Sequence, residues 1–278
     1  HDGSDVSYPV GGGELTLASL HSEFDSGAKL DVRGASGTFK GRATANGSLP
    51  QQIALRSLRT DFDGEMAADG NHRLVLTSLT ASGGTTRDRA SALARDIPGV
   101  GSDEALASAI ATAFQNSTVR LRNAGFATSA DGFTLTARAP VQIEGAQKAS
   151  LTVSPRGATP LVRTVGAQIT GGFNLDVAGG GLPQVRLAVA SYRYRTDQNR
   201  TLLDADAEFK TALSYGSFRG IDLSGSAKLA MAGERVRFDV PQCADLALAS
   251  YTAAGADLVR DLKGRFCAPA IEMNGERL

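Results

Sequence analysis

The sequence predicts a mainly β protein: a large antiparallel sheet with one short pair of helices inserted in it. Apolar and polar residues alternate with period two in many segments, for example Phe133 to Ala137 and Arg235 to Val240. Side chains along a strand point to opposite faces in turn, so this pattern gives the sheet one apolar and one polar face. The 32 glycines and the low aromatic content of 6% indicate many turns and few bulky core residues.

The first third of the chain is typical of a β-meander, in which neighbouring strands pair in sequence. Turn signals lie at Asp25-Ser26-Gly27, at Asn46-Gly47 and at Asp69-Gly70-Asn71. They separate expected strands at Glu14 to Phe24, Lys29 to Thr38, Phe39 to Leu49, Gln52 to Phe62, Gly64 to Ala68 and Arg73 to Ala81.

Between Thr86 and Phe114 the apolar period changes from 2 to 3.6, which predicts two short helices in an insert over 86–115. Pro98 and Gly99 separate them, and Ser102 is the expected N-cap of the second. The insert has one apolar stripe, so it either packs over part of the sheet as core or forms a lid or end-plug over an open apolar surface.

After the insert the strand pattern returns and continues to the end of the chain. The expected strands are Thr118 to Thr128, Gly132 to Ala139, Val141 to Glu144, Lys148 to Ser154, Gly166 to Val177, Gln184 to Thr196, Thr201 to Ser214, Gly216 to Met231 and a final hairpin region bounded by two cysteines. No composition shift marks a linker, so we expect a single elongated unit over 1–278 with a Cys-linked C-terminal region over 235–278.

Composition argues against several classes of function. The 29 basic and 29 acidic residues balance without a one-signed run, which disfavours nucleic acid and anionic lipid headgroups as partners. The three histidines, His1, His21 and His72, do not lie in any catalytic motif, and the carboxylates are scattered. We therefore expect no enzyme activity, no catalytic residue, no metal and no cofactor. The chain starts at His1 without a signal-like segment, so we expect a piece of a longer parent chain with any membrane anchor outside it.

Cys243 and Cys267 are the only cysteines. They have neither C-x-x-C spacing nor a nearby histidine, which excludes the usual zinc and redox motifs. A structural disulfide, worth about 3 kcal/mol in the chain-entropy model, is the favoured interpretation and indicates an oxidising compartment. Two reduced, buried thiols are the alternative.

The layout of most of the chain resembles a known family, and the resemblance is sharpest from about Gly179 to Pro269. The strand segments Phe133-Thr134-Leu135 and Ala149 to Val153, the Gly180-Gly181-Leu182-Pro183 entry into Val185 to Leu187, and the Cys243/Cys267 pair with Arg265 to Pro269 resemble the YdbH-like proteins of Gram-negative bacteria. These belong to the AsmA-like superfamily of intermembrane transport proteins, which includes the TamB-like members.

The resemblance implies a fold, a location and a function. The fold would be an elongated, curved sheet, open as a groove with an apolar concave face. The location would be the periplasm, with an inner-membrane anchor outside this chain and with components of the inner and outer membranes as partners. The function would be the transport of phospholipid acyl chains between the two membranes. This chain lacks an inner-membrane helix and is much shorter than a full bridge, so it would be one segment of it.

The strands alternate apolar and polar residues, and the sequence shows no set of catalytic residues. Both features are consistent with a dry surface that binds acyl chains, where each buried methylene stabilises the complex by about 0.8 kcal/mol. The residues expected on the groove face are Leu30, Val32, Val119, Leu121, Phe133, Leu135, Leu151, Val153, Val185, Leu187, Val189, Val236 and Phe238. Two alternatives remain open at this point: a closed β-sandwich or solenoid module without ligand, and an all-β enzyme acting, for example, on carbohydrate.

Overall fold

The computed structural model describes residues 6–10, 13–31, 34–49, 53–67, 71–96, 104–130, 132–197, 200–215, 217–232, 235–253, 256–267 and 270–274. The chain splits into two compact units. Unit 1 contains His1–Ser154 and Gly180–Leu182, and unit 2 contains Pro155–Gly179 and Pro183–Leu278. This division concerns contacts within each unit, so a single elongated arrangement over 1–278 stays a prediction.

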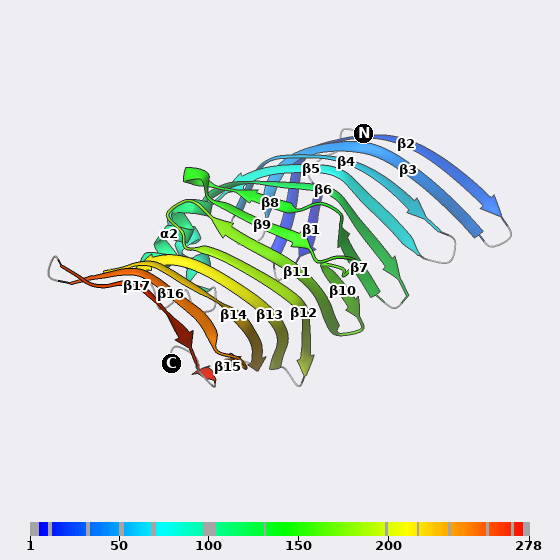
Figure 1. The fold of residues 1–278 in the computed structure, drawn as a ribbon. Helices are drawn as coiled ribbons and strands as arrows, with labels where there is room; N and C mark the ends of the chain where they lie inside the picture. Colours follow the sequence, from blue (N-terminus) through cyan, green and yellow to red (C-terminus); the bar gives the residue numbers. More distant parts are fainter. Residues whose placement is uncertain are drawn as a thin grey trace. The chain divides into compact units, whose positions relative to one another are not determined.

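Unit 1 is an antiparallel sheet of long strands (Figure 1). Its elements are β1 (Val6–Val10), β2 (Gly13–Asp31), β3 (Gly34–Leu49), β4 (Ile53–Met66), β5 (His72–Gly84), β6 (Asn116–Ser129), β7 (Gly132–Ala137), β8 (Val141–Glu144), the 3-10 turn η2 (Ala146–Lys148) and β9 (Ser150–Pro155). Strands β1 to β6 pair in sequence order. Both β7 and β8 pair with β6, and β9 pairs with β8.

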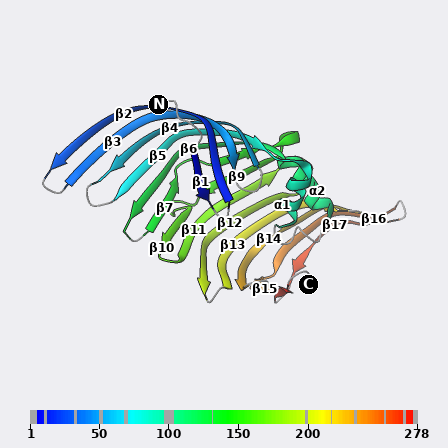
Figure 2. The ribbon, with the colours of Figure 1, turned by 180° about the vertical axis from the view of Figure 1, so that it is seen from behind.

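Two helices, α1 (Arg87–Arg95) and α2 (Glu104–Phe114), connect β5 to its partner β6. The Oγ1 of Thr86 caps α1 by accepting a hydrogen bond from the backbone N–H of Arg89 at 3.3 Å. The helices lie side by side (Figure 2), with Ala94 and Ala107 only 2% and 1% exposed where they pack together. The two-helix insert is confirmed, while the expected break at Pro98 and Gly99 and the N-cap Ser102 lie outside the described residues.

Two of the expected turns in the meander are wrong. Asp25-Ser26-Gly27 lies inside β2, where Ser26 is paired with Phe39 of β3. Asn46-Gly47 lies inside β3, at a register irregularity against β4 between Ala45 and Gly47. A β-bulge accommodates an extra residue without ending the strand, so a turn-forming dipeptide at that position need not form a turn. The third expected turn, Asp69-Gly70-Asn71, falls between β4 and β5 in the chain, and Asp69 and Gly70 lie outside the described residues.

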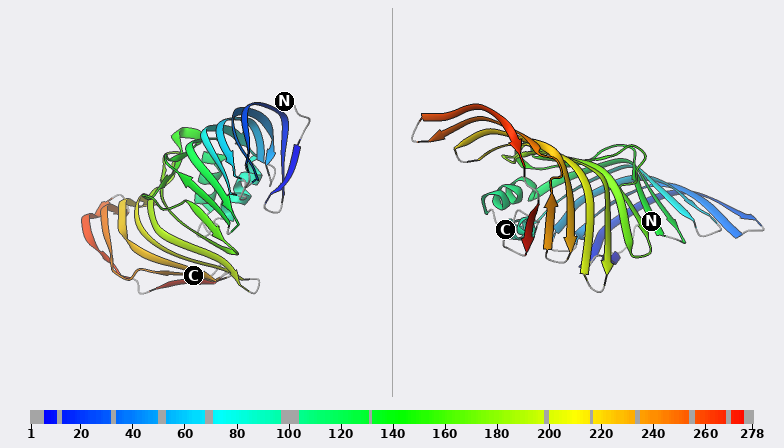
Figure 3. Two further views of the ribbon diagram at one scale, coloured as in Figure 1. Left: turned by 90° about the vertical axis from the view of Figure 1, so that its right-hand side faces the viewer. Right: turned by 60° about the horizontal axis from the view of Figure 1, so that its bottom comes forward.

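Unit 2 is also antiparallel, and its yellow to orange strands lie side by side in Figure 3. Its strands are β10 (Val162–Val165), β11 (Gln168–Ala178), β12 (Gln184–Asp197), β13 (Arg200–Tyr215), β14 (Phe218–Ala232), β15 (Arg235–Asp239), β16 (Ala244–Ala253), β17 (Ala256–Phe266) and β18 (Ile271–Asn274). Strands β10 to β14 pair in sequence order. Strand β14 then pairs with both β15 and β16, β15 pairs with β18, and β16 pairs with β17.

The predicted class is confirmed as mainly antiparallel β structure with a two-helix insert. The expected final hairpin is β16–β17, which the cysteines bound. The curvature of the sheet and its opening as a groove stay predictions.

Candidate functional site

In unit 1 the strand register gathers apolar side chains on one face. Leu79 of β5 lies opposite Leu121 of β6, and Ala81 lies opposite Val119. The face continues through Val119 to Ile143 of β8 and then to Leu151 of β9. We call this surface the apolar face of unit 1; the register also places on it Phe39, Leu49, Ile53, Leu55, Leu58, Phe62, Leu74, Leu76, Phe126, Phe133, Leu135, Val141 and Val153.

Six of the residues expected in the groove therefore share this face: Val119, Leu121, Phe133, Leu135, Leu151 and Val153. All six side chains are half-buried. Leu30 lies in β2, opposite Ala35 of β3 in the strand register, and Val32 lies outside the described residues. Binding of lipid by these residues stays a prediction.

The opposite face of unit 1 carries paired charges. The Nε of Arg42 on β3 lies 2.7 Å from Oδ1 of Asp61 on β4, and the hydroxyl of Ser78 on β5 donates to Asp61 Oδ2 at 2.7 Å. These two hydrogen bonds, Ser78 first, hold the pKa of Asp61 below its usual range. Arg120 and Glu144 form a further ion pair across β6 and β8. This face is polar, so the apolar face is the one whose covering has to be explained.

Unit 2 repeats this arrangement. Leu187 of β12 lies between Leu175 of β11 and Phe209 of β13, and Val185 and Val189 share its side of the strand. The same face reaches Phe238 and Val236 of β15 through Leu229 and Met231 of β14. The apolar face of unit 2 thus contains all five groove residues expected in this part of the chain: Val185, Leu187, Val189, Val236 and Phe238. Val189 is only 4% exposed, and the other four are half-buried.

Tyr192 fixes one edge of the apolar face of unit 2. Its ring lies 5.9 Å from that of Phe173, and its hydroxyl donates to the backbone carbonyl of buried Leu161 at 2.7 Å. Its cross-strand partner is Gly171, where an added Cβ would lie 2.7 Å from the tyrosine ring. Burial raises the pKa of Tyr192, so the hydroxyl remains a neutral hydrogen-bond donor.

The other face of unit 2 is again charged. Arg186 Nε lies 2.9 Å from Asp176 Oδ2, and Arg237 contacts both Asp239 and Glu272. The hydrogen bond to Asp239, followed by the charge of that carboxylate, raises the pKa of Arg237.

Few large side chains are buried in either unit. Among the described residues, eleven of the sixteen buried apolar residues are alanines, and no large side chain is fully buried. A packed sandwich core would bury leucine, valine and phenylalanine, so these faces resemble open surfaces more than a closed interior.

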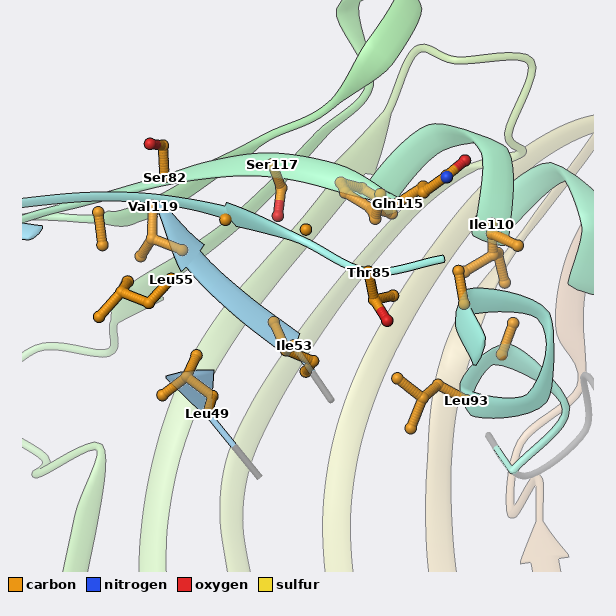
Figure 4. A pocket seen from close by; sticks show the side chains of 17 residues that line it. Leu49, Ile53, Leu55, Ser82, Thr85, Leu93, Ile110, Gln115, Ser117 and Val119 are labelled. Carbon is orange, nitrogen blue, oxygen red and sulfur yellow. The ribbon is translucent and has the colours of Figure 1, made fainter. Parts of the chain in front are cut away.

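An apolar pocket of about 250 Å³ lies where the helix pair meets the apolar face of unit 1 (Figure 4). Leu55 and Val119 line it from the sheet, and Leu93 and Ile110 line it from the helices. Val119 is the one expected groove residue in this pocket. Five further apolar residues line the pocket, and the sequence pattern does not place them on a binding face: Leu49, Ile53, Leu93, Ile110 and Phe114.

In unit 2, Cys243 and Cys267 form a disulfide, with Sγ atoms 1.96 Å apart and Cα atoms 4.3 Å apart. The two cysteines directly flank the Ala244–Phe266 pair of the β16–β17 ladder. The predicted pairing is confirmed, and it joins the two strands of one hairpin at their ends.

Within the described ranges, no helix is long and apolar enough to cross a membrane, and no cluster of three or more His, Cys, Asp or Glu residues could hold a metal ion. No family model, curated protein or solved structure matches the chain. Its function therefore has to be argued from the geometry of the two apolar faces.

Proposed function

We propose that this protein binds phospholipid acyl chains on the apolar faces of its two units. In this proposal it forms one segment of a periplasmic conduit that moves lipid between the inner and outer membranes of a Gram-negative cell. The observation that carries the proposal is that long runs of apolar side chains share one face in each unit and are only half-buried. Apolar surface of this extent is a binding signal in a soluble protein.

The chemistry of the two faces supports an alkyl ligand. An acyl chain needs a continuous dry surface and no specific polar contact, and each methylene it buries contributes about 0.8 kcal/mol. The charged groups lie on the opposite faces, where several form ion pairs, as Arg42 does with Asp61 and Arg186 with Asp176. The disulfide of Cys243 and Cys267 is consistent with the oxidising periplasm.

The direct test is native mass spectrometry of the chain purified from the periplasm without detergent exchange. We expect co-purified phospholipid with the unmodified protein. Leu79→Glu and Leu187→Glu, one on each apolar face, should reduce the bound lipid, because a carboxylate on a dry surface must be desolvated.

Thr80→Glu is the matched control for Leu79→Glu. Thr80 is the next residue on β5, it is exposed, and it lies between Arg59 and Arg120 in the strand register. A carboxylate at this position lies between the guanidinium groups of Arg59 and Arg120 and away from the apolar face. The variant should therefore fold and bind lipid as the unmodified protein does. Absence of lipid from the unmodified protein would contradict the proposal. Unfolding by Leu79→Glu and Leu187→Glu, with Thr80→Glu intact, would identify the faces as closed core.

A further inference from the structure

The pocket under the helix pair lies where the apolar face of unit 1 reaches one end of its strands. Leu55, Ala81 and Val119 belong both to the apolar face and to the pocket lining. The opposite wall comes from α1 and α2, through residues such as Leu93 and Ile110 (Figure 4). The pocket is therefore a continuation of the apolar face, and the helix pair forms its opposite side.

This pocket offers no charged side chain to pair with a charge or a phosphate. None of its 17 lining residues is charged. Ser82 is turned away from it, and its hydroxyl lies 2.7 Å from that of Ser57. The backbone carbonyl of Gln115 already accepts a hydrogen bond from Thr85 N–H at 3.0 Å. Burying a charged group among these walls would cost several kcal/mol without compensation.

Two adjacent glycines shape the pocket floor. An added Cβ at Gly83 would lie 2.7 Å from the carbonyl oxygen of Ala54, and one at Gly84 would lie 2.3 Å from Oδ1 of Asn116. There is thus no room for a side chain at these two positions, where β5 leads into the helix pair. The volume of about 250 Å³ is below the roughly 300–1,000 Å³ of pockets that enclose a whole drug-sized ligand. It suits part of an alkyl chain and not an entire phospholipid.

We infer that this pocket receives the methyl end of a single acyl chain and that the helix pair acts as an end stop for chains lying on the apolar face of unit 1. The headgroup then lies outside the pocket. This inference rests on the proposed function and adds to it a direction for the bound lipid.

The absence of tryptophan from the chain allows a fluorescence test without background. Phe114→Trp places a single tryptophan in the pocket lining, and Leu93→Trp does the same from α1 should the first variant fail to fold. Phe133→Trp places it on the same apolar face but at the far end of β6, where Phe133 pairs with Thr128. The probes are stearoyl lysophospholipids with a nitroxide quencher either at the methyl end of the chain or beside the carbonyl.

We expect the methyl-end label to quench the pocket tryptophan more strongly than the carbonyl-side label. Equal quenching by the two labels, or stronger quenching by the carbonyl-side label, would overturn the end-stop inference. Quenching at Phe133→Trp with none at the pocket tryptophan would also overturn it, while leaving the proposed function standing. No quenching at any position by either probe would contradict the proposed function itself.

Discussion

At the scale of single residues, a close approach between Phe39 and Gly64 shapes the apolar face of unit 1. The two residues are cross-strand partners, and a Cβ added at Gly64 would lie 1.9 Å from the Phe39 ring. The ring therefore covers the glycine backbone and reaches Phe62, with the two ring centroids 6.0 Å apart. An aromatic ring over a glycine compensates for the packing that the glycine lacks.

We expect Gly64→Ala to lower the free energy of unfolding by about 1–3 kcal/mol, because the new methyl group displaces the Phe39 ring. In a Phe39→Ala background the same change should cost less or become stabilising, since glycine itself weakens a strand. Urea unfolding of the four proteins in this double-mutant cycle measures the difference. If Gly64→Ala destabilised the protein equally in both backgrounds, a clash with the Phe39 ring would not be the cause of the destabilisation.

Asp61 predicts a pH-dependent contribution to stability. Its folded-state pKa is lowered by Ser78 and Arg42, so its stabilising effect is complete above the unfolded value of about 3.9 and is lost as the pH falls through the folded value. We expect Asp61→Asn to lower the urea midpoint at neutral pH, with the gap from the unmodified protein closing in acid. A gap that persists unchanged in acid would contradict a role for the carboxylate charge.

The control for this titration is Asp63→Asn on the same strand. Asp63 has only a 4.0 Å approach to the exposed Lys40 ammonium. Such surface pairs contribute little to stability, so this variant should shift the midpoint less than Asp61→Asn does.

At the scale of elements, the disulfide stabilises a hairpin whose strand β17 is largely exposed. Ten of the eleven residues of β17 are exposed, including Leu258 and Leu262, and the ladder to β16 is irregular after Tyr251. The disulfide links residues 24 positions apart, and closing a loop of this length contributes about 3 kcal/mol.

We expect Cys243→Ser with Cys267→Ser to remove most of that contribution and to open β17 locally. Amide hydrogen exchange should become faster along β16 and β17, while the amides of β12 and β13 keep their protection. Uniformly faster exchange in all four strands would mean that the hairpin does not open separately from the rest of unit 2.

The elements show where sequence reasoning succeeds and where it fails. The face of each expected groove residue in β6 to β9 and in β12 to β15 followed from alternation, because a shared apolar side must keep its register across paired strands. Strand ends did not follow, as Asn46-Gly47 shows, because a bulge and a turn use the same residue types. Leu121 and Ala124 lie on the same face although they are three residues apart, and Asn123 between them has φ 51°. That irregularity breaks the period-two rule.

The pocket could not be predicted for a different reason. The helical period of the apolar residues in the insert, which include Leu93 and Ile110, predicts two helices with an apolar stripe. It does not predict which strands that stripe packs against. The approach of the helices to Leu55 and Val119 depends on how β5 and β6 end. The signal that was available is the Gly83-Gly84 pair, which marks a close approach at the point where the chain leaves the sheet.

At the scale of the whole molecule, folding without a ligand leaves apolar side chains in contact with water in both units. The buried set is dominated by alanine, and alanine contributes much less to stability on burial than leucine or phenylalanine. A ligand that covers the two apolar faces would therefore supply part of the burial that a closed core provides in other proteins. If the proposed function holds, bound lipid is a determinant of stability as well as cargo.

We expect a stearoyl lysophospholipid, added as monomer to delipidated protein, to raise the unfolding temperature. At a hundred times its Kd the ligand stabilises the folded state by about 2.7 kcal/mol, which corresponds to a rise of roughly 5 °C for a chain of this size. Differential scanning calorimetry measures the shift. Glycerophosphocholine, which has the headgroup without the chain, should give none. The Leu79→Glu/Leu187→Glu double variant should respond less than Thr80→Glu. An equal rise with glycerophosphocholine would contradict binding on the apolar faces. It would mean that the protein recognises the headgroup through its charged faces, since the headgroup alone would then account for the stabilisation.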